Sequence, residues 1–238
     1  MVRARGVAVA ALACLAAWAP PPASAQPAAQ GRVLFLEGCA TCHGDDARGL
    51  PGQAPSLHGV GARAADFYLS TGRMPLAEPR TTPVRAPPQY MAAERRALVD
   101  YVASLGGPGI PDVTPQRGSL AVGFQQFTSH CAGCHQAVAQ GGVVPDDVAP
   151  SLQQATPRQI AEAVRVGPHV MPAFPESQID RHELDSIVRY VLSTRSPPDR
   201  GGWGLGNLGP IPEGMVAWLL AGAALLIVLR LLGERSRP

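Results

Sequence analysis

The chain has 238 residues, of which 46% are hydrophobic and 16% charged, so it can bury a core and is not disordered by composition. Its 26 glycines and 25 prolines exclude a long helical bundle and favour short elements joined by loops. All 20 basic residues are arginines, which excludes mechanisms that need a lysine, such as a Schiff base or a P-loop. The net charge is +2 without any basic run, so nucleic acid is not expected as a partner.

Residues 1–25 have the pattern of a secretory signal. Arg3 and Arg5 precede an apolar run over residues 6–19, and Ala23-Ser24-Ala25 is a small-residue cleavage site. The alternative is an uncleaved anchor. The apolar run is too short for that role, because the hydrocarbon core of a bilayer is about 30 Å thick and a helix rises about 1.5 Å per residue. We therefore expect an exported protein.

Two five-residue motifs contain every cysteine that follows the signal segment. They are Cys39-Ala40-Thr41-Cys42-His43 and Cys131-Ala132-Gly133-Cys134-His135. The spacing C-x-x-C-H is typical of c-type haem attachment, because two thiols add to the two vinyl groups of the porphyrin and the adjacent histidine reaches the iron. A thioredoxin-like site is disfavoured since no βαβ pattern surrounds the motifs, and a zinc site since each lacks a nearby fourth ligand.

The similarity between the two halves extends beyond these motifs. A glycine and a phenylalanine precede each first cysteine by eight and four residues, and each half ends in an amphipathic helix with a central tyrosine, over residues 93–105 and 180–193. The corresponding positions are Gly31 and Gly123, Phe35 and Phe127, residues 54–57 and 149–152, Met74-Pro75 and Met171-Pro172, and Tyr101 and Tyr190.

Each half resembles a class I cytochrome c domain, over residues 30–105 and 120–194. The resemblance implies an all-α fold of two tandem domains, each wrapped around one covalently bound haem c. It also implies that an N-terminal helix, over residues 31–37 or 123–130, crosses the terminal helix of its domain. Gly31 and Gly123 are expected to allow the close approach at these crossings. The aromatic pairs Phe35–Tyr101 and Phe127–Tyr190 are then expected to pack at these crossings.

The resemblance implies four axial iron ligands. His43 and His135 supply one side of each haem, and a methionine usually supplies the other. Met74 and Met171, each followed by proline, are the expected ligands. Met91 is an alternative that we expect to begin a helix, and His169 is a weaker one. The remaining histidines are expected on the surface: His58, His130 and His182.

The resemblance also implies partners around the haems. The carbonyl groups of Pro55 and Pro150 are expected to accept a hydrogen bond from the second ring nitrogen of His43 and His135. Arg73 and Arg165 are candidates to bind haem propionates, with a solvated surface arginine as the alternative for each.

The C-terminal segment is expected to cross a membrane once. Residues 215–229 are unbroken apolar, and residues 212–232 are long enough to span a bilayer. Trp218 lies near one end, and Arg230, Arg235 and Arg237 near the other. The positive-inside rule places these arginines in the cytoplasm and the haem domains on the outer side of the cell membrane.

The whole chain is similar to the dihaem cytochrome c subunit of actinobacterial-type quinol–cytochrome c reductase, because two cytochrome c domains lead through the Gly-rich residues 201–214 into one C-terminal helix. This resemblance implies cytochrome b and Rieske iron–sulfur subunits as partners, a terminal oxidase as acceptor, and a role as the electron-transfer subunit of a translocase that is not catalytic alone. The alternatives are the dihaem subunit of a haem–copper oxidase or of a periplasmic dehydrogenase, and a dihaem peroxidase.

The expected division of the chain is a signal (1–25), first domain (26–106), linker (107–117), second domain (118–196), linker (197–211), span (212–232) and cytoplasmic tail (233–238).

The position of the anchor predicts an order of electron transfer. The second domain is joined to the span by residues 196–212 and is held near the membrane, so its haem is expected to accept electrons from the Rieske centre. The first domain is joined to the second through residues 106–117, which are rich in Gly and Pro and are expected to form a semi-rigid spacer. Its haem is then expected to pass electrons outward.

Overall fold

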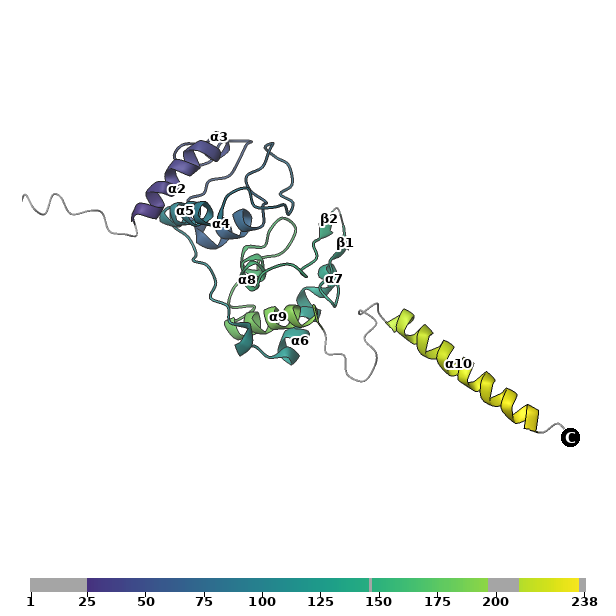
Figure 1. Ribbon diagram of the computed structural model, residues 1–238. Helices are drawn as coiled ribbons and strands as arrows, with labels where there is room; N and C mark the ends of the chain where they lie inside the picture. Colours follow the sequence, from purple (N-terminus) through teal and green to yellow (C-terminus); the bar gives the residue numbers. More distant parts are fainter. Residues whose placement is uncertain (1–24, 146, 197–209, 236–238) are drawn as a thin grey trace, which may run out of the picture. The chain divides into compact units, whose positions relative to one another are not determined.

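The computed structural model describes residues 25–145, 147–196 and 210–235 (Figure 1). Over these residues the chain is mostly helical, and it forms two compact units that divide after Arg195. The predicted signal segment, apart from Ala25, and the Gly-rich residues 201–209 lie outside the described residues, as does Arg237.

The first half of the larger unit contains four helices, α2 (Ala25–Gly38), α3 (Ala40–His43), α4 (Gly61–Ser70) and α5 (Ala92–Ser104). Helix α2 packs across α5, and the two meet so closely at Gly31 that an added Cβ would overlap the carbonyl oxygen of Ala97. Phe35 and Tyr101 pack at this crossing with ring centroids 5.1 Å apart. The expected helix crossing and aromatic pair are both present, and α2 begins six residues earlier than the expected residue 31.

The second half repeats this arrangement with α6 (Leu120–His130), α7 (Ala132–His135), α8 (Pro157–Val166) and α9 (Arg181–Ser193), preceded by a short 3-10 helix, η1 (Pro115–Arg117). Helix α6 packs across α9, where a Cβ on Gly123 would overlap the carbonyl oxygen of Ser186. Phe127 and Tyr190 lie 5.3 Å apart between ring centroids. Phe127 is almost fully buried, so the crossing is the centre of this core.

Side-chain caps fix where the helices of the second half begin. The Asp180 carboxylate accepts a hydrogen bond from the backbone N–H of Glu183, and the Glu183 carboxylate accepts one from the N–H of Asp180. Thr156 and Gln159 cap α8 in the same reciprocal way. These caps satisfy donors that have no partner inside a helix, and they explain why α9 begins within one residue of its predicted start.

The second half also contains a short hairpin that the all-α expectation did not include. Strand β1 (Gly142–Val144) pairs antiparallel with β2 (Asp147–Ala149), in the loop between α7 and α8. The corresponding loop of the first half has only an isolated bridge between Leu50 and Ala54. The hairpin makes the second loop longer, because the motif histidine and its proline partner are 15 residues apart there and 12 apart in the first half.

The two halves of the larger unit contact each other directly through α4 and α8. The side-chain amide of Gln159 donates to the carbonyl oxygen of Ser70 at 3.2 Å, and Arg158 forms an ion pair with Asp66 at 3.5 Å. Glu162 is fully buried at the same contact and faces Asp66. The halves are therefore docked against each other.

The segment expected as a spacer is packed along both halves. The N–H of Arg63 donates to the carbonyl oxygen of Pro108, and Ile110 packs against the first core. Val113 packs against the second core, and the N–H of Thr114 donates to the Asp185 carboxylate at 2.7 Å. The expectation of a spacer considered only glycine and proline content, whereas the apolar residues between them are anchored in the two cores.

The smaller unit contains the helix α10 (Pro210–Arg235). Within the described chain, residues Gly214–Arg235 form one helix that is long and apolar enough to cross a membrane, and its side chains are exposed. Arg230 and Glu234 pair at 3.2 Å near its end. The helix contains the expected span from residue 212 to residue 232.

Candidate haem-binding sites

The first C-x-x-C-H motif forms a single helical turn. Cys39 precedes α3 and accepts at its carbonyl oxygen a hydrogen bond from the N–H of His43, which ends the helix. The His43 ring nitrogen Nδ1 lies 2.9 Å from the carbonyl oxygen of Pro55. A proton on Nδ1 satisfies this carbonyl and leaves Nε2 unprotonated, which is the form of imidazole that binds a metal ion.

The second motif repeats the geometry in a more buried site. Nδ1 of His135 lies 3.0 Å from the carbonyl oxygen of Pro150. His135 is 8% exposed, and burial lowers its pKa although the Pro150 contact opposes the shift. The ring is therefore neutral at physiological pH, as an iron ligand must be. Both expected proline carbonyl partners are present.

A glycine in each loop allows the proline carbonyl to reach its histidine. Gly141 has φ +82°, and a Cβ at this position would lie 2.5 Å from the carbonyl oxygen of Ala149 and 2.7 Å from the carbonyl carbon of Pro150. Its N–H donates to the carbonyl oxygen of His135 at 3.0 Å. Gly49 has the same φ and the same contacts in the first loop. The left-handed conformation and the close approach both require glycine.

The first cysteine of each motif, Cys39 or Cys131, is not arranged as a reactive thiol. All four motif cysteines are free, without a disulfide. Burial raises the pKa of the Cys39 and Cys131 thiols, that of Cys131 to about 11, with the neighbouring cysteine adding to the shift. A redox-active or nucleophilic cysteine needs a lowered thiol pKa. These cysteines fit attachment of a group better than thiol–disulfide chemistry.

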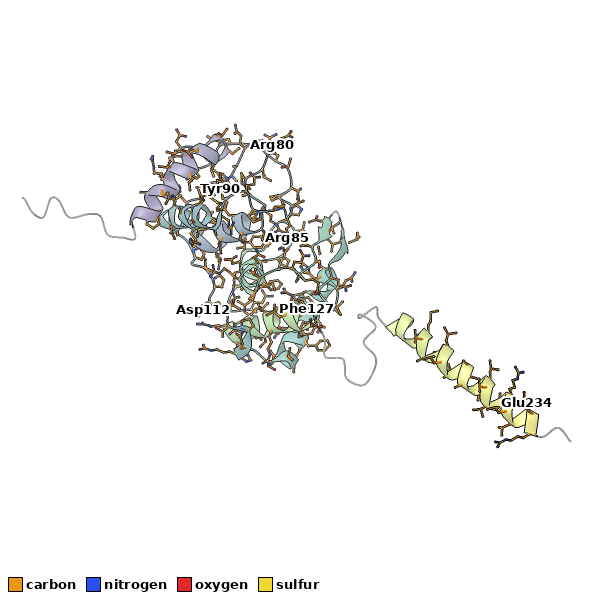
Figure 2. All side chains as sticks on the ribbon, viewed as in Figure 1. Arg80, Arg85, Tyr90, Asp112, Phe127 and Glu234 are labelled. Carbon is orange, nitrogen blue, oxygen red and sulfur yellow. The ribbon has the colours of Figure 1, made fainter. Side chains whose placement is uncertain are left out.

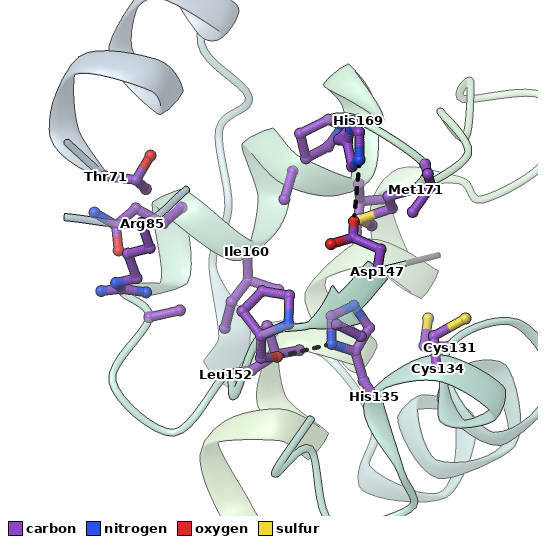
Figure 3. A pocket seen from close by; sticks show the side chains of 18 of the residues that line it. Thr71, Arg85, Cys131, Cys134, His135, Asp147, Leu152, Ile160, His169 and Met171 are labelled. Carbon is purple, nitrogen blue, oxygen red and sulfur yellow. Dashed lines mark hydrogen bonds and ion pairs between the residues drawn. The ribbon is translucent and has the colours of Figure 1, made fainter. Parts of the chain in front are cut away.

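A cavity of about 300 Å³ lies beside the second motif (Figure 3). Cys131, Cys134 and His135 line it together with Met171. Most of the remaining wall is apolar, and it includes Phe127, Leu152, Ala155, Ile160, Val164 and Phe174. A neutral histidine, a methionine and two thiols around one apolar cavity suit a porphyrin whose iron takes a nitrogen and a sulfur ligand.

The methionines considered for the first haem differ in burial. Met74 is half-buried and packs against the core of the first half, whereas Met91 is 72% exposed at the start of α5. His169 lines the second cavity, but its Nε2 pairs with the Asp147 carboxylate at 3.2 Å. The histidines expected on the surface are exposed, and His58 binds the carbonyl oxygen of Asp46 at 2.9 Å while His130 also borders the second cavity.

The two arginines considered for propionates have different surroundings from those expected. Arg165 is buried, and its Nη1 donates to the carbonyl oxygens of Phe174 at 2.9 Å and Ile179 at 2.8 Å. It therefore holds the loop between α8 and α9. Arg73 lies over the ring of Phe67, 5.0 Å from its centroid, and borders the cavity of the second motif.

Three further polar groups near the sites carried no signal in the sequence. Tyr90 hydrogen-bonds the Cys39 side chain, and its hydroxyl fills the space beside Gly38. The Asp147 carboxylate pairs with Nε2 of His169, so this ring nitrogen is not free to bind a metal ion. Arg85 borders the second cavity from the first half of the chain. Each depends on contacts between distant segments, which no local motif reveals.

Two family descriptions match the chain, one in each half. Residues 28–106 match the family described as cytochrome c. Residues 118–191 match the family described as cytochrome c oxidase, cbb3-type, subunit III. With its two C-x-x-C-H sites, the chain is a c-type cytochrome of two domains that carries covalently bound haem c.

Relatives of similar length narrow this class. The cytochrome bc1 complex cytochrome c subunit of Corynebacterium diphtheriae is 34% identical over 228 residues, covering 87% of this chain and 80% of that protein. The subunit of the same name from Mycobacterium bovis is 36% identical over 216 residues, covering 87% and 77%. The chain belongs to the family of cytochrome bc1 complex cytochrome c subunits.

More distant similarities also occur. The cbb3-type cytochrome c oxidase subunit CcoP of Azospirillum sp. (strain B510) is 30% identical over 185 residues, covering 68% of this chain and 60% of that protein. A chain of the reducing HAO-like protein complex of Kuenenia stuttgartiensis aligns with a TM-score of 0.32 and 14% identity, over 69% of this chain and 95% of that chain. The latter likeness is too weak to carry an argument.

Proposed function

We propose that this protein is a membrane-anchored dihaem cytochrome that carries electrons from the Rieske iron–sulfur centre of a quinol–cytochrome c reductase to a terminal oxidase or another acceptor. The observation that carries the proposal is the paired geometry of His43 with Pro55 and His135 with Pro150, each directly after two attachment cysteines. The names of the relatives support the assignment to a bc1 complex.

Eight residues are proposed to hold the two haems. Cys39 and Cys42 form thioethers with the first haem, and His43 and Met74 bind its iron. Cys131 and Cys134 attach the second haem, whose iron is bound by His135 and Met171. The shared cavity of the second set and the exposure of Met91 support this choice.

The haem iron supplies a centre that changes by one electron, and the residues of this chain set how readily it does so. Pro55 and Pro150 fix the proton of each histidine on Nδ1, so that Nε2 stays available to the metal. A thioether ligand is soft and favours the reduced iron. The apolar wall of the second cavity limits the entry of water and of small ligands.

The domain division and membrane topology are part of the proposal. We propose a signal over residues 1–25, haem domains over 26–106 and 118–196, and a span over 212–232 that leads into a cytoplasmic tail. The haem domains then lie on the extracytoplasmic side. The apolar helix and the arginines at its C-terminal end support this orientation.

Cytochrome b and a Rieske protein are the proposed partners, and the subunit is not catalytic without them. The second haem is proposed to receive electrons first, because its domain directly precedes the anchor in the sequence. The first haem then passes them on. The similarity to cbb3-type oxidase subunits gives specific support to one alternative, a dihaem subunit built into a haem–copper oxidase.

Purification from native membranes tests the proposal. A tagged full-length protein is expected to copurify with cytochrome b and a Rieske protein, and to retain the mass of two haems after denaturation. Quinol is expected to reduce both haems in this preparation. In a Met74→Leu variant, quinol should still reduce the second haem while onward transfer slows. Copurification with an oxidase alone, or a mass gain of one haem, would contradict the proposal.

A further inference from the structure

The first half of the chain forms part of the wall of the second haem cavity. Phe67, Thr71 and Arg73, at or near the end of α4, border it, as do residues 82–85 of the following loop. The opposite part of the wall comes from the second motif and from the hairpin (Figure 3). The repeat assigns this haem site to the second domain, but the first domain supplies part of its wall.

The wall segment has no counterpart in the second half. Residues 75–91 separate Met74 from α5, whereas the shorter stretch 172–180 separates Met171 from α9. The longer loop is tied back to its own domain, since the N–H of Ala86 donates to the carbonyl oxygen of Thr71 at 3.1 Å. It is tied to the second domain by Arg85, whose Nη2 donates to the carbonyl oxygen of Gln154 at 3.4 Å.

Two guanidinium groups from this wall have no carboxylate partner within the described part of the chain. Among the described residues, neither Arg73 nor Arg85 forms an ion pair with an acidic side chain. Both guanidinium groups border the same cavity, where Arg73 lies over the ring of Phe67, so two positive charges face one apolar space and repel each other. Asp147, an acidic residue of the cavity wall, pairs instead with His169. An anion between the arginines would relieve the repulsion.

The chemistry of a c-type haem identifies that anion. The vinyl groups that react with cysteines and the two propionates lie on opposite edges of the porphyrin. Figure 3 shows Cys131 and Cys134 on one side of the cavity and Arg85 and Thr71 on the opposite side. We propose that Arg73 and Arg85 of the first domain bind the propionate carboxylates of the haem attached to the second domain.

This inference rests on the proposed attachment of a haem at Cys131 and Cys134, and it adds a role for the first domain. Guanidinium groups bind carboxylates through charge-assisted hydrogen bonds. Their positive charge also favours the reduced haem, because reduction adds an electron to the iron. Arg73 and Arg85 are positioning residues that set the potential of a haem in the neighbouring domain.

Redox titration of the purified full-length protein tests the inference, with Arg85→Gln and Arg73→Gln as the variants. At the ambient potential where the second haem is half reduced in the unaltered protein, we expect its ratio of reduced to oxidised form to fall several-fold in each variant. Arg80→Gln is the matched control, because Arg80 lies on the same loop but donates to the carbonyl oxygen of Gly52 at 2.7 Å and does not border the cavity. Arg85→Lys should restore most of the ratio.

The pH dependence separates carboxylate binding from a structural role. Without its arginine a propionate has a raised pKa, so the potential of the second haem should acquire a new fall with rising pH in the weakly acidic range. Each haem contributes one component to the redox titration curve. The component that Met171→Leu shifts belongs to the second haem. The inference is overturned if the arginine variants leave that component unchanged, or shift it without the new pH dependence. A different result would contradict the proposed function instead. In that case Met171→Leu shifts neither component while the arginine variants keep their effect, and Met171 is then not the axial ligand of the second haem.

Discussion

The ring of His135 points its Nδ1 at the carbonyl oxygen of Pro150, 3.0 Å away, across the base of a hairpin loop that closes on Gly141. Replacing this glycine should disturb the proposed iron ligand His135 without altering its side chain. An alanine at Gly141 has a strained backbone and overlaps the backbone of Ala149 and Pro150. We expect Gly141→Ala to weaken the Pro150 contact, reduce the basicity of the imidazole and raise the potential of the second haem, as measured by redox titration.

The neighbouring Gly142 provides the control for this variant. An added Cβ there lies 3.2 Å from the flexible side chain of Gln136 and 3.3 Å from the carbonyl oxygen of Cys134, so it overlaps neither, in contrast to the 2.5 Å approach at Gly141. Gly142→Ala should leave both the potential and the thermal unfolding midpoint close to those of the unaltered protein. Equal effects of the two substitutions would show that the loop is merely sensitive to bulk.

Removing an axial methionine should open one iron to small ligands. Met74→Leu and Met171→Leu each replace the sulfur with a side chain of similar size that cannot bind metal. Each should lower the potential of one haem and allow carbon monoxide to bind that haem when reduced. Met91→Leu should do neither, because Met91 is 72% exposed. Carbon monoxide binding in Met91→Leu but not in Met74→Leu would reverse the assignment in the first domain.

The crossing of α6 and α9 should tolerate no side chain at Gly123. An added Cβ overlaps the carbonyl oxygen of Ser186 and also contacts the Tyr190 side chain at 2.9 Å. Forcing apart packed helices costs roughly 1–3 kcal/mol of the free energy of unfolding. We expect Gly123→Ala to lower the midpoint of denaturant unfolding followed by circular dichroism. Gly133→Ala, whose Cβ meets nothing within 4 Å, should leave it unchanged.

The carboxyl group of Glu162 should make stability depend on pH. Burial, reinforced by Asp66 and opposed by Arg158, raises the pKa of Glu162 to about 9. The unfolded chain ionises this group near its ordinary value of about 4.3. The folded state therefore loses relative stability progressively as pH rises from about 5 to about 9, where ionisation in the folded protein completes the loss.

Glu162→Gln removes this titration while keeping the size of the side chain. The free energy of unfolding of the variant, from denaturant titrations at several pH values, should exceed that of the unaltered protein by an amount that grows from pH 5 to pH 9. The exposed Glu176 supplies the control, since Glu176→Gln should give a constant difference over this range. A constant difference for Glu162→Gln as well would place the Glu162 pKa near that of a solvated carboxyl group.

The sequence was most informative where a function depends on neighbouring residues. The C-x-x-C-H turn is local, so its geometry follows directly from residues 39–43 and 131–135. The helix crossings at Gly31 and Gly123 could also be predicted, because the resemblance to class I cytochrome c domains implies them. Capping by Asp180 accounts for the accurate start of α9.

Contacts between distant segments could not be read from spacing. Arg165 precedes Met171 by only six residues, yet its guanidinium binds the carbonyl oxygens of Phe174 and Ile179 and is fixed in the loop. Arg73 lies beside Met74 in the chain but borders the other haem cavity. The spacer prediction underestimated Ile110 and Val113, because two apolar residues among prolines and glycines gave no periodic pattern.

The packed segment between the domains bears on how an electron crosses from one haem to the other. A carrier on a loose tether must diffuse to its partner, and its transfer rate slows in a viscous solvent. Here Ile110 and Val113 are anchored in opposite cores while α4 and α8 are in contact, so the two proposed haem sites are packed into one unit. We therefore expect exchange between the two haems to occur by tunnelling, with a rate that added glycerol leaves unchanged.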